Sequence, residues 1–145
     1  MDPFLLLLLS HILGDVIFAS NRLAVLKRKS GIFDQILANG WHTSLHAFFA
    51  GLIFFLADRE WVWPSLLVFS FHFLIDFIRC KVEIHFFGPG RVLLTRKEVM
   101  VWIFRRKKAL RNIPKGTLAP WFLINFTDQA AHLCSLYAIS EVVGR

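Results

Sequence analysis

Four apolar stretches constrain the fold of this sequence more than any other feature. They cover about residues 3–20, 41–57, 62–80 and 118–143, close to the roughly 20 residues that a helix needs to cross a bilayer. Apolar residues make up 56% of the 145, including 16 Phe and 5 Trp. We therefore expect a single all-α domain, built as a polytopic membrane protein with a bundle of four transmembrane helices.

The charged connections between these stretches predict a topology. Arg22, Lys27, Arg28 and Lys29 lie in the first connection, and the third, about 81–117, is strongly basic. Four spans place both connections on one side, so we expect both in the cytoplasm and both termini outside. Segment 97–111 has an apolar and a cationic face, which predicts a basic interfacial helix, with a solvated loop as the alternative. Segment 31–39 predicts a short interfacial helix ending at Gly40.

The net charge of +7 points to lipid and not to nucleic acid as the partner. The basic residues lie between the apolar stretches, where they can face membrane lipids with anionic headgroups. Binding of nucleic acid would instead need a basic face on a folded soluble domain. A homo-oligomer or a cytosolic protein partner stays open. Cys80 and Cys134 have no metal-binding spacing and are taken as ordinary thiols.

Each apolar stretch carries one pair of His or Asp side chains four residues apart. The pairs are His11 with Asp15, His42 with His46, His72 with Asp76, and Asp128 with His132. This spacing puts both members of a pair on one face of a helix. Such groups are costly in lipid, at roughly 2.5–3.5 kcal/mol for Asp on insertion scales. With the predicted topology, all four pairs can meet in the cytoplasmic half of the bundle.

Five imidazoles and three carboxylates form a natural ligand set for divalent metal. Four-helix bundles build two-metal sites from inward-facing groups of this kind. The donors favour Zn, with Fe or Mn possible, as one or two ions. Asp15 or Asp76 could act as a general base instead of a ligand. Arg79 and Gln129 are candidates for the substrate headgroup, and the alternative for the whole cluster is interhelical hydrogen bonding alone.

The motifs that carry these pairs resemble a known family. The pieces SHILGD (10–15), WHTSLH (41–46), FHFLID (71–76) and FTDQAAH (126–132) are similar to the signature of domain-of-unknown-function family 3307. The resemblance implies a small bacterial integral protein of the inner membrane. It also implies that these family positions are functional: His11, Asp15, His46, His72, Asp76, Asp128, Gln129 and His132.

These observations together predict a membrane-embedded, metal-dependent enzyme. A hydrolase acting on a lipid or lipid-linked substrate is favoured, since a bound metal polarises ester or phosphoryl oxygens. Di-iron oxygenase chemistry ranks lower, because such enzymes generally use more His and fewer Asp. The alternatives from other classes are a proton or metal-ion conduit and a non-catalytic regulatory or partner-binding protein.

Overall fold

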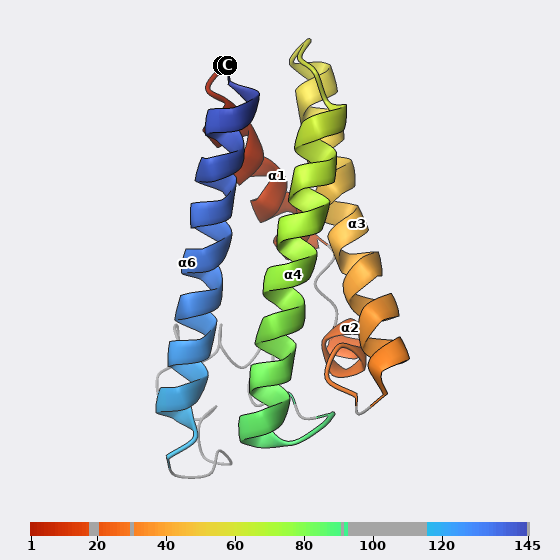
Figure 1. The fold of residues 1–145 in the computed structure, drawn as a ribbon, viewed down its shortest axis with the longest axis vertical. Helices are drawn as coiled ribbons and strands as arrows, with labels where there is room; N and C mark the ends of the chain where they lie inside the picture. Colours follow the sequence, from red (N-terminus) through yellow and green to blue (C-terminus); the bar gives the residue numbers. More distant parts are fainter. Residues whose placement is uncertain (18–20, 30, 91, 93–115, 145) are drawn as a thin grey trace.

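The computed structural model is all-α over the residues it describes, which are 1–17, 21–29, 31–90, 92 and 116–144. Its helices are α1 (Pro3–Ile17), α2 (Asn21–Leu26), α3 (Ile32–Leu56), α4 (Val62–Phe87) and α6 (Leu118–Val143). The long helices α3, α4 and α6 run side by side, with α1 behind them near the C-terminal end of α6 (Figure 1). Helix α1 packs against α3 and α6, and α4 packs against the same two helices from the other side.

Local sequence explains where the long helices begin and end. The carboxylate of Glu60 accepts the backbone N–H of Val62 at 2.7 Å and so satisfies a donor at the start of α4. Pro64 falls in the first turn of that helix, where its missing N–H costs nothing. Gly88, with φ of 85°, ends α4 in the left-handed region that favours glycine. The tight turn before α4 puts Asp58 at φ of 54°.

An apolar layer fills the end of the bundle near the two chain termini. It joins α1, α3, α4 and α6 and consists of Leu6, Leu7, Ala50, Phe54, Val68, Leu136 and Ile139. Neighbouring helices are antiparallel. One turn away from this layer, on the side opposite the chain termini, each helix contributes to a second layer of side chains. That second layer is polar, and it contains the predicted His and Asp pairs.

The predicted membrane bundle is wrong. None of the described helices has both the length and the apolar character required to cross a membrane. Helix α1 is only 15 residues long, and α4 carries Asp76, Arg79 and Glu83 along its length. The predicted placement in the inner membrane, with basic connections inside and termini outside, is therefore also wrong. The all-α part of the prediction agrees with the described residues.

Two helices begin or end differently from the prediction. Segment 31–39 is not a separate helix, because α3 runs without a break through Gly40. Helix α4 continues past Cys80 to Phe87, so its charged last turns belong to the bundle and not to a connection. Short α2 follows α1 where only a connection was expected. The predicted interfacial helix at 97–111 lies outside the described residues.

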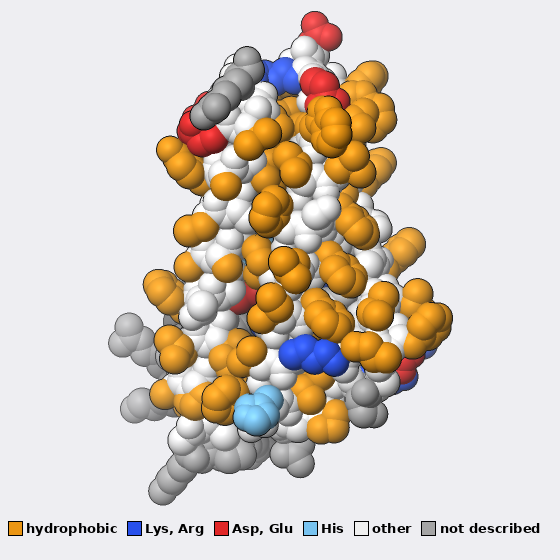
Figure 2. Space-filling model, in the orientation of Figure 1, with side chains coloured by type: hydrophobic (Ala, Val, Ile, Leu, Met, Phe, Trp, Pro, Cys, Tyr) orange, Lys and Arg blue, Asp and Glu red, His pale blue; other side chains and the backbone are white. Residues whose placement is uncertain are grey.

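Many apolar side chains lie on the surface of the bundle. Figure 2 shows them in orange over nearly the full height of one face. They include Phe48, Phe55, Ile78 and Leu123, each more than half exposed. Apolar exposure alone therefore does not mark a particular site on this molecule.

Candidate metal centre

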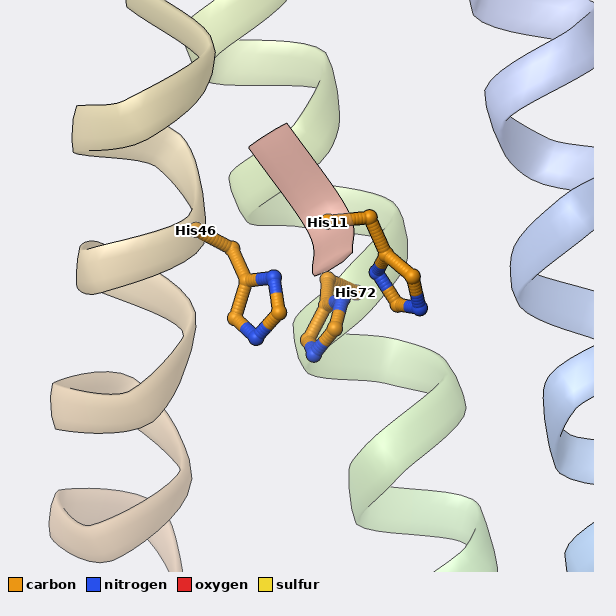
Figure 3. Close-up of side chains that lie close together, drawn as sticks. All are labelled: His11, His46 and His72. Carbon is orange, nitrogen blue, oxygen red and sulfur yellow. The ribbon is translucent and has the colours of Figure 1, made fainter. Parts of the chain in front are cut away.

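The polar layer brings all four predicted pairs to one place. Seven of their eight side chains are buried, and Asp15 is half-buried. His11 of α1, His46 of α3 and His72 of α4 point toward one another (Figure 3). The imidazoles of His46 and His72 stack with ring centroids 3.9 Å apart, and His72 stacks on His132 at 4.1 Å. Residues far apart in sequence therefore form one contiguous imidazole cluster.

The carboxylates lie among these rings at ionic-contact distances. Asp15 Oδ1 is 3.4 Å from His46 Nε2 and 3.8 Å from His42 Nε2. Asp76 Oδ2 is 3.5 Å from His42 Nε2, and its Oδ1 is 3.7 Å from His132 Nε2. Most of these separations exceed a good N–H···O hydrogen bond. Most of the carboxylate oxygens and ring nitrogens are therefore too far apart for good hydrogen bonds with one another, and they face a shared centre.

Glycine at position 14 permits this approach of α1 to α3. A Cβ built on Gly14 would lie 2.5–2.8 Å from three atoms of the His46 imidazole. Such contacts are far inside van der Waals distance, so a side chain here would force the ring of His46 away. The absence of a side chain at Gly14 therefore makes room for a member of the cluster.

Burial keeps the imidazoles of His11, His42 and His72 in the form that binds metal. Desolvation lowers the pKa of His11 to about 4 against the weaker opposing effect of Asp15. Desolvation, with the charge of Lys27, lowers the pKa of His42 to about 3. The pKa of His72 is also well below its ordinary value because of burial. Neutral imidazoles keep a free lone pair at pH 7, which is what metal coordination requires.

The three carboxylates differ in their surroundings. Burial by itself would raise the pKa of Asp15, but contacts with His46, His11 and His42 outweigh it and lower the value to about 2. Burial opposes ionisation of Asp76 too, yet Lys27 and the imidazoles lower its pKa. For Asp128 burial prevails over the nearby Arg79, and the pKa is raised.

Several buried donor and acceptor atoms of the cluster have no hydrogen-bond partner. They are both ring nitrogens of His11 and of His46, Nε2 of His72, Nδ1 of His132 and Oδ1 of Asp128. Leaving such a group unsatisfied costs about 1–3 kcal/mol. A bound cation would satisfy several of them at once, so the residues fit a metal.

Four overlapping triads bring their ligand atoms within 4.8 Å of one another. The triads are His11, His46 and His72; Asp15, His42 and His46; His42, His72 and Asp76; and Asp76, Asp128 and His132. Together they include each of the eight ligands predicted from the sequence. The second and fourth share no residue, so the geometry has room for two ions. Coordination by these residues stays a prediction.

The chain matches a described family over residues 4–145, under the description "Protein of unknown function (DUF3307)". The chain belongs to this family. The match confirms the resemblance carried by the four motifs, and it names no activity. No curated protein and no solved structure matches the chain significantly.

In this member of the 3307 family, a cavity of about 150 Å³ opens beside the cluster. Its lining includes Asp15, His42, His72, Asp76, Asp128 and His132. The two residues predicted to meet a substrate headgroup, Arg79 and Gln129, also line it. The amide of Gln129 donates to Asp128 Oδ2 at 3.2 Å.

Two cations of the cavity were missed by sequence reasoning. Lys27 and Arg28 were expected to face lipid headgroups, but both are buried. Lys27 pairs with Asp76, and Arg28 pairs with Glu83. They follow α2 in an irregular segment, so periodicity gave no signal that they turn inward.

Two further site residues on α4 did carry a signal. Cys80 and Glu83 follow Asp76 by four and seven residues, which places all three on one helical face. Cys80 lines the cavity, and burial raises the pKa of its thiol. Cys80 was taken as an ordinary thiol because it has no metal-binding spacing, and Glu83 was placed in the third connection, outside the predicted helix.

Proposed function

We propose that this chain is a hydrolase that holds one or two divalent metal ions in its His/Asp cluster. The observation that carries the proposal is the set of buried ring nitrogens of His11, His46, His72 and His132 that lack hydrogen-bond partners. Native proteins rarely leave so many buried polar atoms unsatisfied in one place. Nitrogen and carboxylate donors suit zinc, and iron or manganese are compatible.

Two ions need two triads that share no residue. Asp76, Asp128 and His132 share none with Asp15, His42 and His46, and none with His11, His46 and His72. A bound ion would supply a Lewis acid and a water of lowered pKa, which are the requirements for hydrolysis of an ester.

If a single ion is held by a triad without Asp128, that carboxylate is free and suits proton transfer best of the three. The sequence suggested Asp15 or Asp76 as general base, but their pKa values are lowered, which makes them weak bases. The raised pKa of Asp128 brings it closer to working pH. Its Oδ1 has no hydrogen-bond partner and the residue lines the cavity.

The alternative functions have less support. A conduit needs polar groups that continue toward both ends of the bundle, whereas the apolar layer with Leu7 and Phe54 lies against one side of the cluster. A purely structural role would predict a cluster that is satisfied internally, and this one is not.

Hydrolysis assays on the purified chain test the proposal. We expect p-nitrophenyl phosphate or p-nitrophenyl acetate to be cleaved, with activity lost on chelation and restored by Zn²⁺ or Mn²⁺. Asp128→Asn should lower the rate by about 10²-fold or more, while His85→Gln, an exposed residue outside the cluster, should not. Activity that chelators and Asp128→Asn leave unchanged would overturn the proposal.

A further inference from the structure

A second, apolar cavity adjoins the cluster. It measures about 390 Å³ and lies between α4 and α6. Its walls are almost entirely apolar side chains, among them Ile75, Ile78, Val82, Phe86, Leu123 and Ile124. Arg79 and Asp128 line this groove and also line the His/Asp cavity. The groove therefore adjoins the candidate metal centre at these two residues.

Comparison with another apolar cavity shows why this adjacency matters. A hollow of about 380 Å³ between α3 and the start of α4 is lined by Phe48, Phe55, Trp61 and neighbouring residues, none of them charged. It shares no lining residue with the His/Asp cavity. Apolar surface is widespread on this molecule (Figure 2). Of these two hollows, only the α4–α6 groove adjoins the cluster.

Arg79 lies where the groove and the cluster meet. Its guanidinium is 3.4 Å from Asp128 Oδ2 and from Glu83 Oε1, and it donates to Asn125 at 2.8 Å. Its Nε is buried without a hydrogen-bond partner. Lys27 and Arg28 also line the His/Asp cavity, each paired with a carboxylate. Guanidinium groups bind phosphate and carboxylate strongly through paired N–H donors.

We infer that the substrate is an amphiphile with a phosphate-type anionic head and one apolar chain. The head would occupy the His/Asp cavity beside Arg79, and the chain would lie in the groove between α4 and α6. This inference rests on the proposed hydrolase function and specifies its substrate class. The physical basis is the attraction of an anionic head to Arg79 and to divalent metal held by the cluster, together with burial of apolar area in the adjoining groove.

Binding of alkyl phosphates of different chain length tests the inference. Ethyl phosphate, octyl phosphate and inorganic phosphate are titrated into the full chain by calorimetry, below the micellar concentration of octyl phosphate. Each methylene removed from water strengthens binding up to about fourfold. We expect octyl phosphate to bind at least about tenfold more tightly than ethyl phosphate, since several methylenes enter the groove.

Matched double variants separate the groove from general apolar adsorption. Ile78→Gln with Leu123→Gln makes the groove polar at residues that are 53% and 66% exposed. Phe48→Gln with Phe55→Gln does the same in the other hollow, at 61% and 64% exposure. The first pair should abolish the preference for octyl over ethyl phosphate, and the second should keep it. Circular dichroism checks that both variants are folded.

The outcomes distinguish this inference from the proposed function. Equal affinity for octyl and ethyl phosphate, or equal loss in both double variants, would overturn the inference while metal-dependent hydrolysis could still stand. Tightest binding by inorganic phosphate would indicate a free-phosphate site and would also overturn it. A chain that binds no metal refutes the hydrolase, and the same titrations on that protein still decide whether the groove takes an alkyl chain.

Discussion

The ammonium of Lys27 pairs with the carboxylate of Asp76, and both side chains are less than a tenth exposed. Asp76 also lies 3.5–3.9 Å from ring nitrogens of His42, His72 and His132. A buried carboxylate needs a cation close by, and Lys27 provides it. The segment after α2 is thereby tied to the centre of the His/Asp cluster.

Removing this cation should destabilise the fold. We expect Lys27→Met to lower the free energy of unfolding by about 3–5 kcal/mol, because it leaves a buried charge without its partner. Lys81→Met, at an exposed position of α4, should change it by less than about 0.5 kcal/mol. Urea unfolding of both variants measures the difference, and equal stability would show that the pair is unimportant.

Two glycines of the bundle should respond oppositely to alanine. Gly14→Ala places a Cβ against the His46 ring, so we expect a loss of stability together with weaker metal binding. At Gly40, inside α3, an added Cβ meets nothing within 4 Å. Gly40→Ala should therefore stabilise the protein by about 0.5–1 kcal/mol. Thermal unfolding and zinc titration provide the two readouts; wild-type behaviour of Gly14→Ala would contradict the close approach.

Stability should fall as the pH drops from about 6.5 to about 4. The folded-state pKa of His11 is about 4, against 6.5 ordinarily, so the unfolded chain binds an extra proton within this window. Each such group makes unfolding easier by about 1.4 kcal/mol per pH unit, and its contribution is complete above pH 6.5. His42, with a pKa of about 3, acts in the same direction.

The measurement is urea unfolding with a chelator present, at several pH values between 7 and 4.5. His11→Gln should reduce the slope of stability against pH by about one proton. A flat profile for the unchanged chain would mean that the imidazoles are not buried in their neutral form.

The convergence of the four pairs could be predicted from the sequence. Spacing of four residues places both members of a pair on one face of a helix. Polar groups on four otherwise apolar helices are most stable when they meet in a common interior. The same apolar stretches led to the wrong expectation of a membrane bundle. The hydropathy of each stretch was considered alone, without the polar turns that belong to the same helix. In α4, for example, the last turns carry Glu83 and lie beyond the predicted span.

Other features of the site depended on tertiary contacts. Lys27 and Arg28 lie in an irregular segment, where only the partners Asp76 and Glu83 determine which way they point. The joining of segment 31–39 to α3 went against the usual helix-ending role of glycine at position 40. There Gln35, Asn39 and Thr43 are buried toward the bundle, and this packing prevails over local propensity.

Metal content is the most direct test of the account. The purified chain is dialysed against buffered zinc, and bound metal is measured by elemental analysis alongside His85→Gln and the double variant His46→Ala with Asp76→Asn, which removes one ligand from every triad. We predict about one or two equivalents in the unchanged chain and in His85→Gln, and near none in the folded double variant. A folded unchanged chain that takes up no metal, or full retention in the double variant, would contradict the assignment of the cluster as a metal centre.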